Sequence, residues 1–357
     1  MNKAIGILGA GAIGAAIGAY LIREGHDVTL IDQWAENIEV MRRDGLKCTD
    51  LNGQFSVPAE ALHISDLSSL GRQFDMVYLA VKSYDTRWST YLIEPFLKPG
   101  GFILPAQNAL NDDAVASIIG YNRTVGCVPS ISVGMYEPGH VVRTDPMTSH
   151  CFTVGELSGQ ITPRVTEVVS ALQVIGPSDA TANIWGARWS KLLINCMMNA
   201  LAGLVGPEIA ALNDEQKATA NLIRVTVGCE VAGIAQALGI SVDPIFGMPA
   251  RVFAEATTAS GVQAAREQWG EVMRKRYLPP EKTKALGAPD RPSLLQDVIK
   301  KRRTEITYLN GEVVRKGESA GIPAPMNQAI TELMQKVESA EIKSTPANLE
   351  QLKAYLK

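Results

Sequence analysis

Short apolar runs alternate with amphipathic stretches through the first half of the chain. Ala4–Leu8 is a continuous apolar run of the kind that forms a buried parallel strand, and helical patterns follow at 15–24 and 85–97. The other predicted strands lie at 26–32, 76–81, 102–105, 124–128 and 151–155. This alternation predicts an α/β fold built on a doubly wound parallel sheet.

The pattern changes near residue 184, where long helical periods replace the strands. These periods cover 191–204, 214–238, 243–258, 261–274, 292–311, 325–340 and 345–355. Asp243 followed by Pro244 is typical of a helix N-cap with proline at the first helical position. Residues 276–291 are rich in Pro, Lys and Gly and are predicted to form a long loop. We therefore expect a sheet domain at 1–183 and an all-helical domain at 184–357.

Composition narrows the class of protein. A chain of 357 residues with 46% hydrophobic and 20% charged residues is typical of a globular protein with two buried cores. The net charge is −3, and the basic run at 300–303 is short and expected on a helix face. Nucleic acids and membrane surfaces are therefore not expected as partners.

Two further sequence features bear on location and metal binding. The N-terminus lacks the pattern of a signal peptide, and no uninterrupted apolar stretch reaches about 18 residues. The five cysteines are scattered and form no CxxC motif, and the four histidines form no cluster with them. We expect reduced thiols, a cytoplasmic location and no metal centre.

A glycine-rich turn follows the first predicted strand. It has GxGxxG spacing, opens a helical pattern, and precedes a strand that ends in an acidic residue. In that context the motif predicts a dinucleotide-binding Rossmann domain, in which the glycines permit a tight turn and close approach of a pyrophosphate. The expected cofactor-binding residues of the turn are Gly9, Ala10, Gly11, Ala12, Ile13 and Gly14. The alternative is a glycine-rich turn without a ligand.

Asp32 ends the second predicted strand, 23 positions after Gly9. A carboxylate at this place accepts hydrogen bonds from the adenosine ribose and repels a 2′-phosphate, which favours NAD(H) over NADP(H). Arg42 and Arg43 are further along the chain and are not the usual adjacent grip on that phosphate. The alternative is that Asp32 caps the next helix.

Polar residues also follow two later strands. Lys82 comes after the strand at 76–81, and Asn108 comes shortly after the strand at 102–105. Because ligands of open α/β sheets lie at the carboxyl ends of strands, we expect both residues to face the cofactor. Each is equally compatible with an ordinary loop position. His140 lies in the sequence Glu-Pro-Gly-His, and we expect it in a turn at the surface.

The helical half contains one polar stripe in an apolar segment. Lys191, Asn195 and Asn199 are spaced i, i+4, i+8, so they share one face of a predicted helix. Loss of hydration favours the neutral form of such a lysine, as a proton donor requires. The alternative is a lysine that reaches past apolar surface to water.

Two residues of the helix predicted at 292–311 carry further candidate chemistry. Ser293 lies at its start and Glu305 about three turns later. Their structural alternatives are an N-cap for Ser293 and a solvated partner of Lys301 or Arg302 for Glu305.

Several motifs, in order and over nearly the whole length, resemble the ketopantoate reductase family. They are Gly9-Ala-Gly-Ala-Ile-Gly14, Val81-Lys82, Gln107-Asn108, Pro138-Gly139, Trp189-Ser-Lys-Leu-Leu-Ile-Asn195, Ser293-Leu-Leu-Gln-Asp, Arg303-Thr-Glu-Ile, Leu309-Asn-Gly and Gly321-Ile-Pro. The resemblance implies a Rossmann domain, a helical domain and an active site in the cleft, where a 2-keto acid is reduced to a 2-hydroxy acid, usually with NADPH.

The resemblance also implies roles for single residues. Lys191 would be the general acid, and Glu305 would help to hold the substrate hydroxyl. Substrate contacts would come from Asn195, Asn199 and Ser293, while Asn108 would lie beside the nicotinamide and the catalytic lysine.

Three departures from the family pattern are visible. Asp32 stands where many relatives favour a basic residue, Ala109 stands where glycine is common, and the stretch 261–291 looks longer than in the family. Alternative functions are therefore a dehydrogenase of another hydroxy acid or alcohol metabolite, and a dinucleotide-sensing regulator without turnover. Apolar helix surface at 222–238 is compatible with a homodimer.

Overall fold

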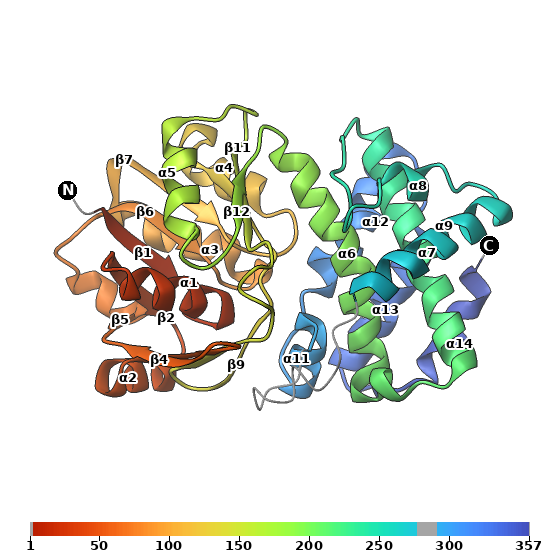
Figure 1. Cartoon of the computed structure of the whole chain (residues 1–357), viewed down its shortest axis with the longest axis horizontal. Helices are drawn as coiled ribbons and strands as arrows, with labels where there is room; N and C mark the ends of the chain where they lie inside the picture. The colour runs from red at the N-terminus through yellow and green to blue at the C-terminus, as the bar shows by residue number, and fades with distance from the viewer. Residues whose placement is uncertain (1–2, 277–290, 357) are drawn as a thin grey trace. The chain divides into compact units, whose positions relative to one another are not determined.

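The computed structural model describes residues 3–276 and 291–356 (Figure 1). The chain divides into two compact units, and their described residues are 3–184 in the first unit and 185–276 with 291–356 in the second. Apart from its end residues, the loop predicted at 276–291 lies outside the described residues, as does the part 277–290 of the stretch 261–291 that departs from the family pattern.

The first unit is built around a five-stranded sheet in which all neighbours are parallel. Its strands, in the order β5-β2-β1-β6-β7, are Glu60–His63, Asp27–Asp32, Ala4–Leu8, Phe74–Leu79 and Leu97–Pro105. The first strand is buried along its whole length, as a central parallel strand with two covered faces should be. The parallel sheet predicted from the apolar runs is confirmed for β1, β2, β6 and β7, whereas β5 was not predicted.

Helices cover both faces of this sheet. Ile5 and Ile7 of β1 pack in the core shared with α1 (Ala12–Arg23). Ala4 and Leu8, which point to the opposite face, pack in a second core with α3 (Thr86–Ile93) and α4 (Asp112–Ile119). Alternation along each strand therefore divides the unit into two apolar layers. Among residues 3–184, the other two α-helices are α2 (Ala35–Asp44) and α5 (Pro163–Leu172).

Two smaller sheets complete the first unit. The order β4-β3-β10-β9 joins Gly53–Val57, Leu46–Asp50, His140–Arg143 and Val133–Glu137. The order β12-β11-β8 joins Ser178–Ala180, Phe152–Glu156 and Val125–Pro129. The strands predicted at 124–128 and 151–155 thus exist, but they pair antiparallel in a separate sheet that touches β7 through one isolated bridge, Ile103–Thr124. Apolar runs show that a strand is buried, not which sheet it joins.

The described residues of the second unit form helices joined by loops. The helices are α6 (Ile184–Val205), α7 (Asp214–Ala237), α8 (Arg251–Ala254), α9 (Ala259–Arg276), α11 (Ser293–Ile299), α12 (Asn310–Ala320), α13 (Pro325–Glu338) and α14 (Asn348–Leu352). By length and composition, the segment that begins with α6 and runs to Ala211 could cross a membrane, but 67% of its most apolar window is buried inside the unit. That burial is typical of a core helix.

The helix predicted at 243–258 is wrong for most of its length. Phe246 and Gly247 adopt positive φ angles of 51° and 85°, and Ile245 pairs with Met248 in an isolated bridge. Asp243 donates its backbone N–H to the Gly186 carbonyl at 3.2 Å and does not cap a helix, because only the short helix α8 forms later. Left-handed residues end helical hydrogen bonding, and Phe246 carries no sequence signal for that conformation.

The single helix predicted at 292–311 is also wrong. It is divided into α11, the 3₁₀ turn Ile306–Tyr308, and the start of α12 at Asn310. Lys301 follows α11 with φ of 52°, so the basic run at 300–303 lies beyond the helix and not on its face. Glu305 is therefore not three helical turns from Ser293.

Candidate active site

The glycine-rich turn has the tight geometry that its motif predicts. Gly9 adopts φ of 101°, and a Cβ atom there would lie 2.6 Å from the Ala80 carbonyl carbon. A Cβ atom on Gly14 would lie 2.0 Å from the Gly9 carbonyl oxygen. A side chain is excluded at both positions, because its Cβ atom would collide with backbone atoms of a neighbouring segment.

Gly11 differs from its two neighbours, because a Cβ atom there would meet no protein atom within 4 Å. Gly11 is the N-cap of α1, makes no side-chain cap, and the first turn of α1 carries no acidic residue. The backbone N–H groups and the positive end of the helix dipole are therefore left for a ligand. This open cradle fits the pyrophosphate of a dinucleotide.

Asp32 lies at the carboxyl end of β2, next to the glycine-rich turn. Its Oδ1 accepts a hydrogen bond from Trp34 N at 2.8 Å. Burial raises the pKa of the Asp32 carboxyl, and backbone N–H groups of Trp34, Ala10 and Gln33 oppose that shift. The N-cap of α2 is Trp34 and α2 has no side-chain cap, so Asp32 is not the cap of that helix.

Asn37 is a residue that the sequence did not single out. It is fully buried, and its Nδ2 donates to the Ala10 carbonyl at 3.0 Å while its Oδ1 accepts from Gly139 N at 2.7 Å. The side chain thus connects the glycine-rich turn to the Pro138-Gly139 turn between β9 and β10. A single asparagine in an amphipathic helix gives no signal of such a role.

The residues after β6 and β7 form two connected turns. Lys82 and Asn108 are both partly buried in them. Gln107 donates from Nε2 to the Val81 carbonyl at 2.8 Å and to Thr86 Oγ1 at 2.9 Å. Asn111 donates to the Asn108 carbonyl at 2.8 Å. Both candidate residues therefore lie at the carboxyl edge of the sheet, where ligands of this kind of fold bind.

Ala109 occupies a glycine-like conformation beside Asn108. Its φ of 66° lies in the left-handed region, which costs an L-residue about 1–2 kcal/mol. The family departure noted at this position therefore coincides with a strained residue, and the turn is held by Gln107 and Asn111 on either side.

In the second unit, the polar stripe of α6 meets the start of α11. Asn199 Nδ2 donates to Asn195 Oδ1 at 3.2 Å and to Ser293 Oγ at 3.1 Å. Lys191 lies one turn before Asn195 and is partly exposed, whereas Leu192 and Leu193 are fully buried. The structure thus brings together three of the residues proposed to contact substrate, next to the proposed proton donor.

Ser293 and Glu305 do not have the structural roles weighed as alternatives. Ser293 is the first residue of α11, whose N-cap is Pro292, so Ser293 is not the cap. Glu305 is only 3% exposed, which excludes a solvated ion pair. Arg302 instead forms its ion pair with the buried Asp297.

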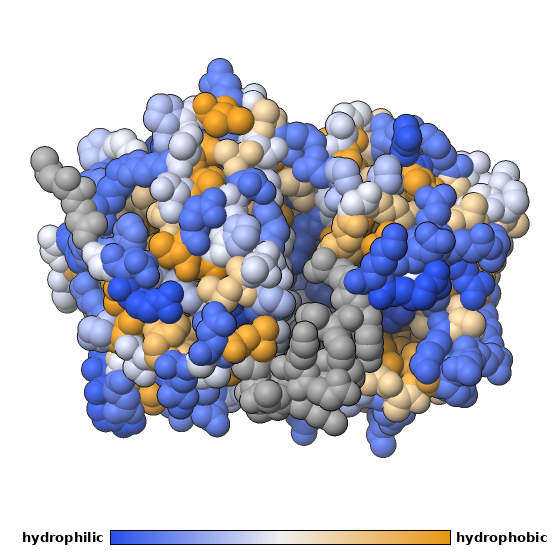
Figure 2. Space-filling model, viewed as in Figure 1, coloured by the Kyte–Doolittle hydropathy of each residue, from blue (hydrophilic) through white to orange (hydrophobic). Residues whose placement is uncertain are grey.

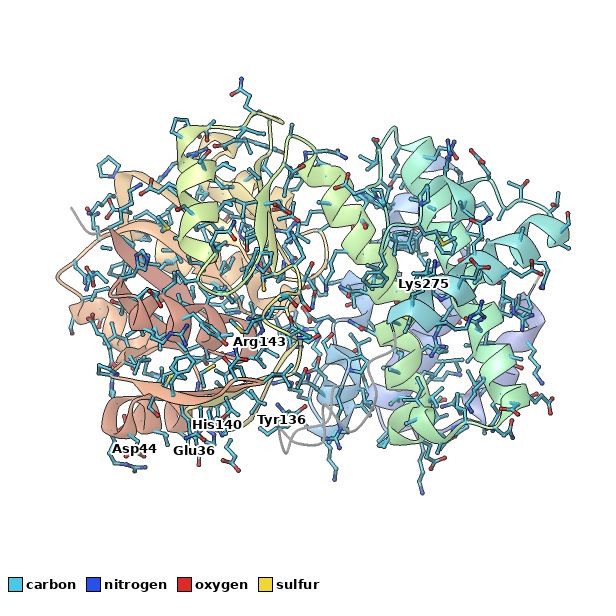
Figure 3. The ribbon with its side chains drawn as sticks, in the orientation of Figure 1. Glu36, Asp44, Tyr136, His140, Arg143 and Lys275 are labelled. Atoms are coloured by element: carbon cyan, nitrogen blue, oxygen red, sulfur yellow. The ribbon has the colours of Figure 1, made fainter. Side chains whose placement is uncertain are left out.

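His140 is partly buried at the start of β10 and is not a turn residue (Figure 3). Its Nε2 lies 2.8 Å from Thr49 Oγ1, and burial and the neighbouring Lys47 lower its pKa. The contact with Thr49 joins β3 and β10 of the small sheet, so the role of His140 is structural.

A parallel sheet with a glycine-rich cradle, joined in one chain to a helical unit, defines a Rossmann-type dinucleotide-binding protein. The family model described as "Ketopantoate reductase PanE/ApbA" matches residues 5–159, and "Ketopantoate reductase PanE/ApbA C terminal" matches 183–338. The chain belongs to the ketopantoate reductase family. Its members are NAD(P)-dependent oxidoreductases that act on a keto or hydroxyl group.

Individual relatives agree with this assignment. The chain is 25% identical over 345 residues to 2-dehydropantoate 2-reductase of Aquifex aeolicus, with 95% of this chain and 98% of that protein covered. A ketopantoate reductase structure from Ralstonia eutropha superposes with a TM-score of 0.71 at 24% identity, covering 94% and 99% of the two chains. D-Mandelate dehydrogenase with NADH and anilino(oxo)acetate superposes with a TM-score of 0.74 at 23% identity, covering 94% and 98%.

Proposed function

We propose that the protein reduces a 2-keto acid to a 2-hydroxy acid with a nicotinamide coenzyme, and that ketopantoate and pantoate are the substrate and product to test first. The observation that carries this proposal is the contact of Asn195, Asn199 and Ser293 beside Lys191, within the part of the chain matched by the C-terminal family model.

The coenzyme would be held by the first unit. Gly9 to Gly14 would bind the pyrophosphate, Asp32 the adenosine ribose, and Lys82 and Asn108 the nicotinamide end. When bound, the nicotinamide supplies the hydride for the keto carbon. The Asp32 carboxylate favours NADH because a 2′-phosphate would bring a second negative charge against it, although NADPH is the usual coenzyme of the family.

The second unit would supply the acid and the substrate contacts. Reduction leaves negative charge on the former keto oxygen, and the Lys191 ammonium would stabilise that charge and donate the proton. Asn195, Asn199 and Ser293 would orient the keto acid by hydrogen bonds. The buried Glu305 carboxylate would hold the substrate hydroxyl, and Asn108 would also contact the substrate.

A second candidate function is oxidation or reduction of a different 2-hydroxy acid pair. The fold that this chain shares with D-mandelate dehydrogenase supports this candidate, because proteins with the same fold can act on different substrates. The stretch 261–291 looks longer than in the family, and we expect a change of substrate to arise there.

The test is to follow the absorbance of NADH and of NADPH while ketopantoate is added to the purified protein. Oxidation of either coenzyme supports the proposal, and the faster coenzyme decides the role of Asp32. Coenzyme binding without oxidation by ketopantoate or a panel of other 2-keto acids and 2-hydroxy acids would contradict it.

Two glycine variants separate coenzyme binding from folding. Gly11→Val places a side chain in the open cradle and should abolish coenzyme binding. Gly71→Val is the matched control, because a Cβ atom there also meets no protein atom within 4 Å, but Gly71 lies outside the cradle. Equal coenzyme affinity in the two variants would contradict the assignment of the cradle.

A further inference from the structure

Residues of three helices of the second unit, α6, α7 and α9, line a pocket. Its volume is about 390 Å³. Met198, Trp269 and Met273 form apolar walls, and Asn221 and Arg224 add polar groups from α7. This size and mixed lining are typical of a site for a small molecule with an apolar body and a polar end.

Two hydrogen-bond donors on residues that line this pocket have no acceptor among the residues that the structure describes. They are Arg224 Nε and Trp269 Nε1, and both atoms are buried. A buried donor without a partner costs about 1–3 kcal/mol, so native proteins seldom leave one without a reason. The Arg224 guanidinium, on a partly exposed residue that lines the pocket, favours a ligand that offers acceptor oxygens.

Arg224 also differs from two arginines of the first unit. Arg143 pairs with Asp145, and Arg164 pairs with Glu156. Within the described residues, no ion pair is found for Arg224, and burial alone lowers its pKa. Because the guanidinium remains charged at neutral pH, the pocket holds an uncompensated positive charge.

The pocket adjoins the polar stripe of α6. Met198 lies seven residues after Lys191, so the two residues share one face of the helix about 10 Å apart along its axis. Lys191, Ile194, Met198 and Asn199 are the partly exposed residues of that stretch, while residues between them are buried. The face with the proposed proton donor is therefore continuous with the pocket wall.

The Trp269 ring is held in place before any ligand binds. It is fully buried, and its ring centre lies 6.3 Å from that of Phe246 and 6.0 Å from that of Phe253. Fixed aromatic walls reduce the entropy lost on binding. The Trp269 ring is thus a preset apolar wall of the pocket.

We propose that this pocket binds the side chain of the keto acid and that this side chain ends in a second anionic group. Arg224 would donate to the terminal carboxylate, while Met198 and Met273 would pack against the apolar chain that leads to it. The inference rests on the proposed reductase function and adds the substrate class, a 2-keto acid with an acidic side chain. Arginine is well suited to this role because its planar fork matches a carboxylate.

The test compares 2-keto acids of matched length whose side chains end in a carboxylate, a carboxamide or a methyl group, for example 2-oxoadipate and its neutral analogues. The parent enzyme should have a KM at least 10-fold lower for the carboxylate. Arg224→Met should raise that KM at least 10-fold, leave kcat within about 3-fold, and leave KM for the neutral analogues unchanged, because one desolvated charge-assisted bond is lost.

Two further variants keep the result interpretable. Trp269→Phe removes only the buried indole N–H and should leave KM for the carboxylate substrate unchanged. Arg251→Met, an exposed arginine of α8 outside the pocket, is the matched control and should change nothing. If Arg224→Met does not fold, Arg224→Lys keeps the charge without the fork and should still raise KM for the carboxylate substrate.

The outcomes separate this inference from the proposed function. Equal KM values for acidic and neutral substrates in the parent, or an equal rise for both in Arg224→Met, would overturn the acidic subsite and leave the reductase intact. Calorimetry with 2-oxoadipate gives a readout without turnover. Arg224-dependent binding with no reduction of any keto acid would support the subsite and contradict the reductase function.

Discussion

Lys191 carries the chemistry of the proposal at the scale of the residue. Lys191→Met removes the proton donor and keeps the volume of the side chain. We expect kcat to fall by about 10²–10⁴-fold while coenzyme affinity is unchanged. Lys217→Met, an exposed lysine of α7 that pairs with Asp214, is the control and should keep full activity. Parent-like turnover of Lys191→Met would exclude the role of general acid.

Asp32 decides the choice of coenzyme. Asp32→Ser removes the carboxylate that repels a 2′-phosphate, so the ratio of kcat/KM for NADPH over NADH should rise at least 10-fold. The control is Asp44→Ser, an exposed carboxylate at the end of α2 that pairs with Arg43 (Figure 3). A parent enzyme that already prefers NADPH strongly would show that Asp32 does not have this role.

At the scale of the element, sequence periodicity predicts helices and strands well where packing is regular. β1 matches its apolar run, and α7 begins at Asp214 as predicted, with Asn213 and Gln216 forming a capping box. The failures at 243–258 and 292–311 have a common cause. Phe246 and Lys301 adopt left-handed conformations, and neither residue type indicates them.

Glu156 connects β11 to α5 and gives that part of the first unit a pH dependence. Burial raises the pKa of the Glu156 carboxyl, but hydrogen bonds from Arg164 and Thr162 outweigh this effect and the pKa lies below its ordinary value. A depressed pKa stabilises the fold above the unfolded-state pKa, and the contribution is lost as pH falls through the folded-state pKa.

Glu156→Gln should therefore lower the free energy of unfolding at pH 7 by about 1.5–3 kcal/mol, and the difference from the parent should shrink below about pH 4. Urea unfolding at several pH values measures this. Glu167→Gln on α5 removes only an exposed pair with Lys3 and should cost about 0–1 kcal/mol. A pH-independent difference for Glu156→Gln would contradict the assigned role.

At the scale of the whole molecule, the chain divides into two compact units, and the first has apolar cores of its own. The hydropathy of the molecular surface is mixed, with apolar side chains dispersed among polar ones on the face shown in Figure 2. The two cores of the first unit consist only of residues from that unit. Two compact units in one chain favour unfolding in more than one step.

Coenzyme binding should then act mainly on one of these steps. We expect calorimetry to resolve at least two transitions, and NADH at 100 times its Kd to stabilise the unit with the glycine-rich turn by about 2.7 kcal/mol. Gly11→Val should lose that shift and Gly71→Val should keep it. A single transition whose calorimetric and van't Hoff enthalpies agree would contradict independent unfolding. The homodimer suggested by apolar helix surface stays a prediction, and sedimentation of the purified protein measures it.

The sequence by itself determined the class of the protein, because the glycine-rich turn and the polar stripe of Lys191, Asn195 and Asn199 depend on short spacings that local geometry translates directly into structure. Tertiary structure decided the contacts between segments distant along the chain. It placed Ser293 against Asn199, Asn37 against the glycine-rich turn, and Arg224 with Trp269 in one pocket. Side-chain identity does not encode which distant partner is near, since that depends on the packing of whole elements.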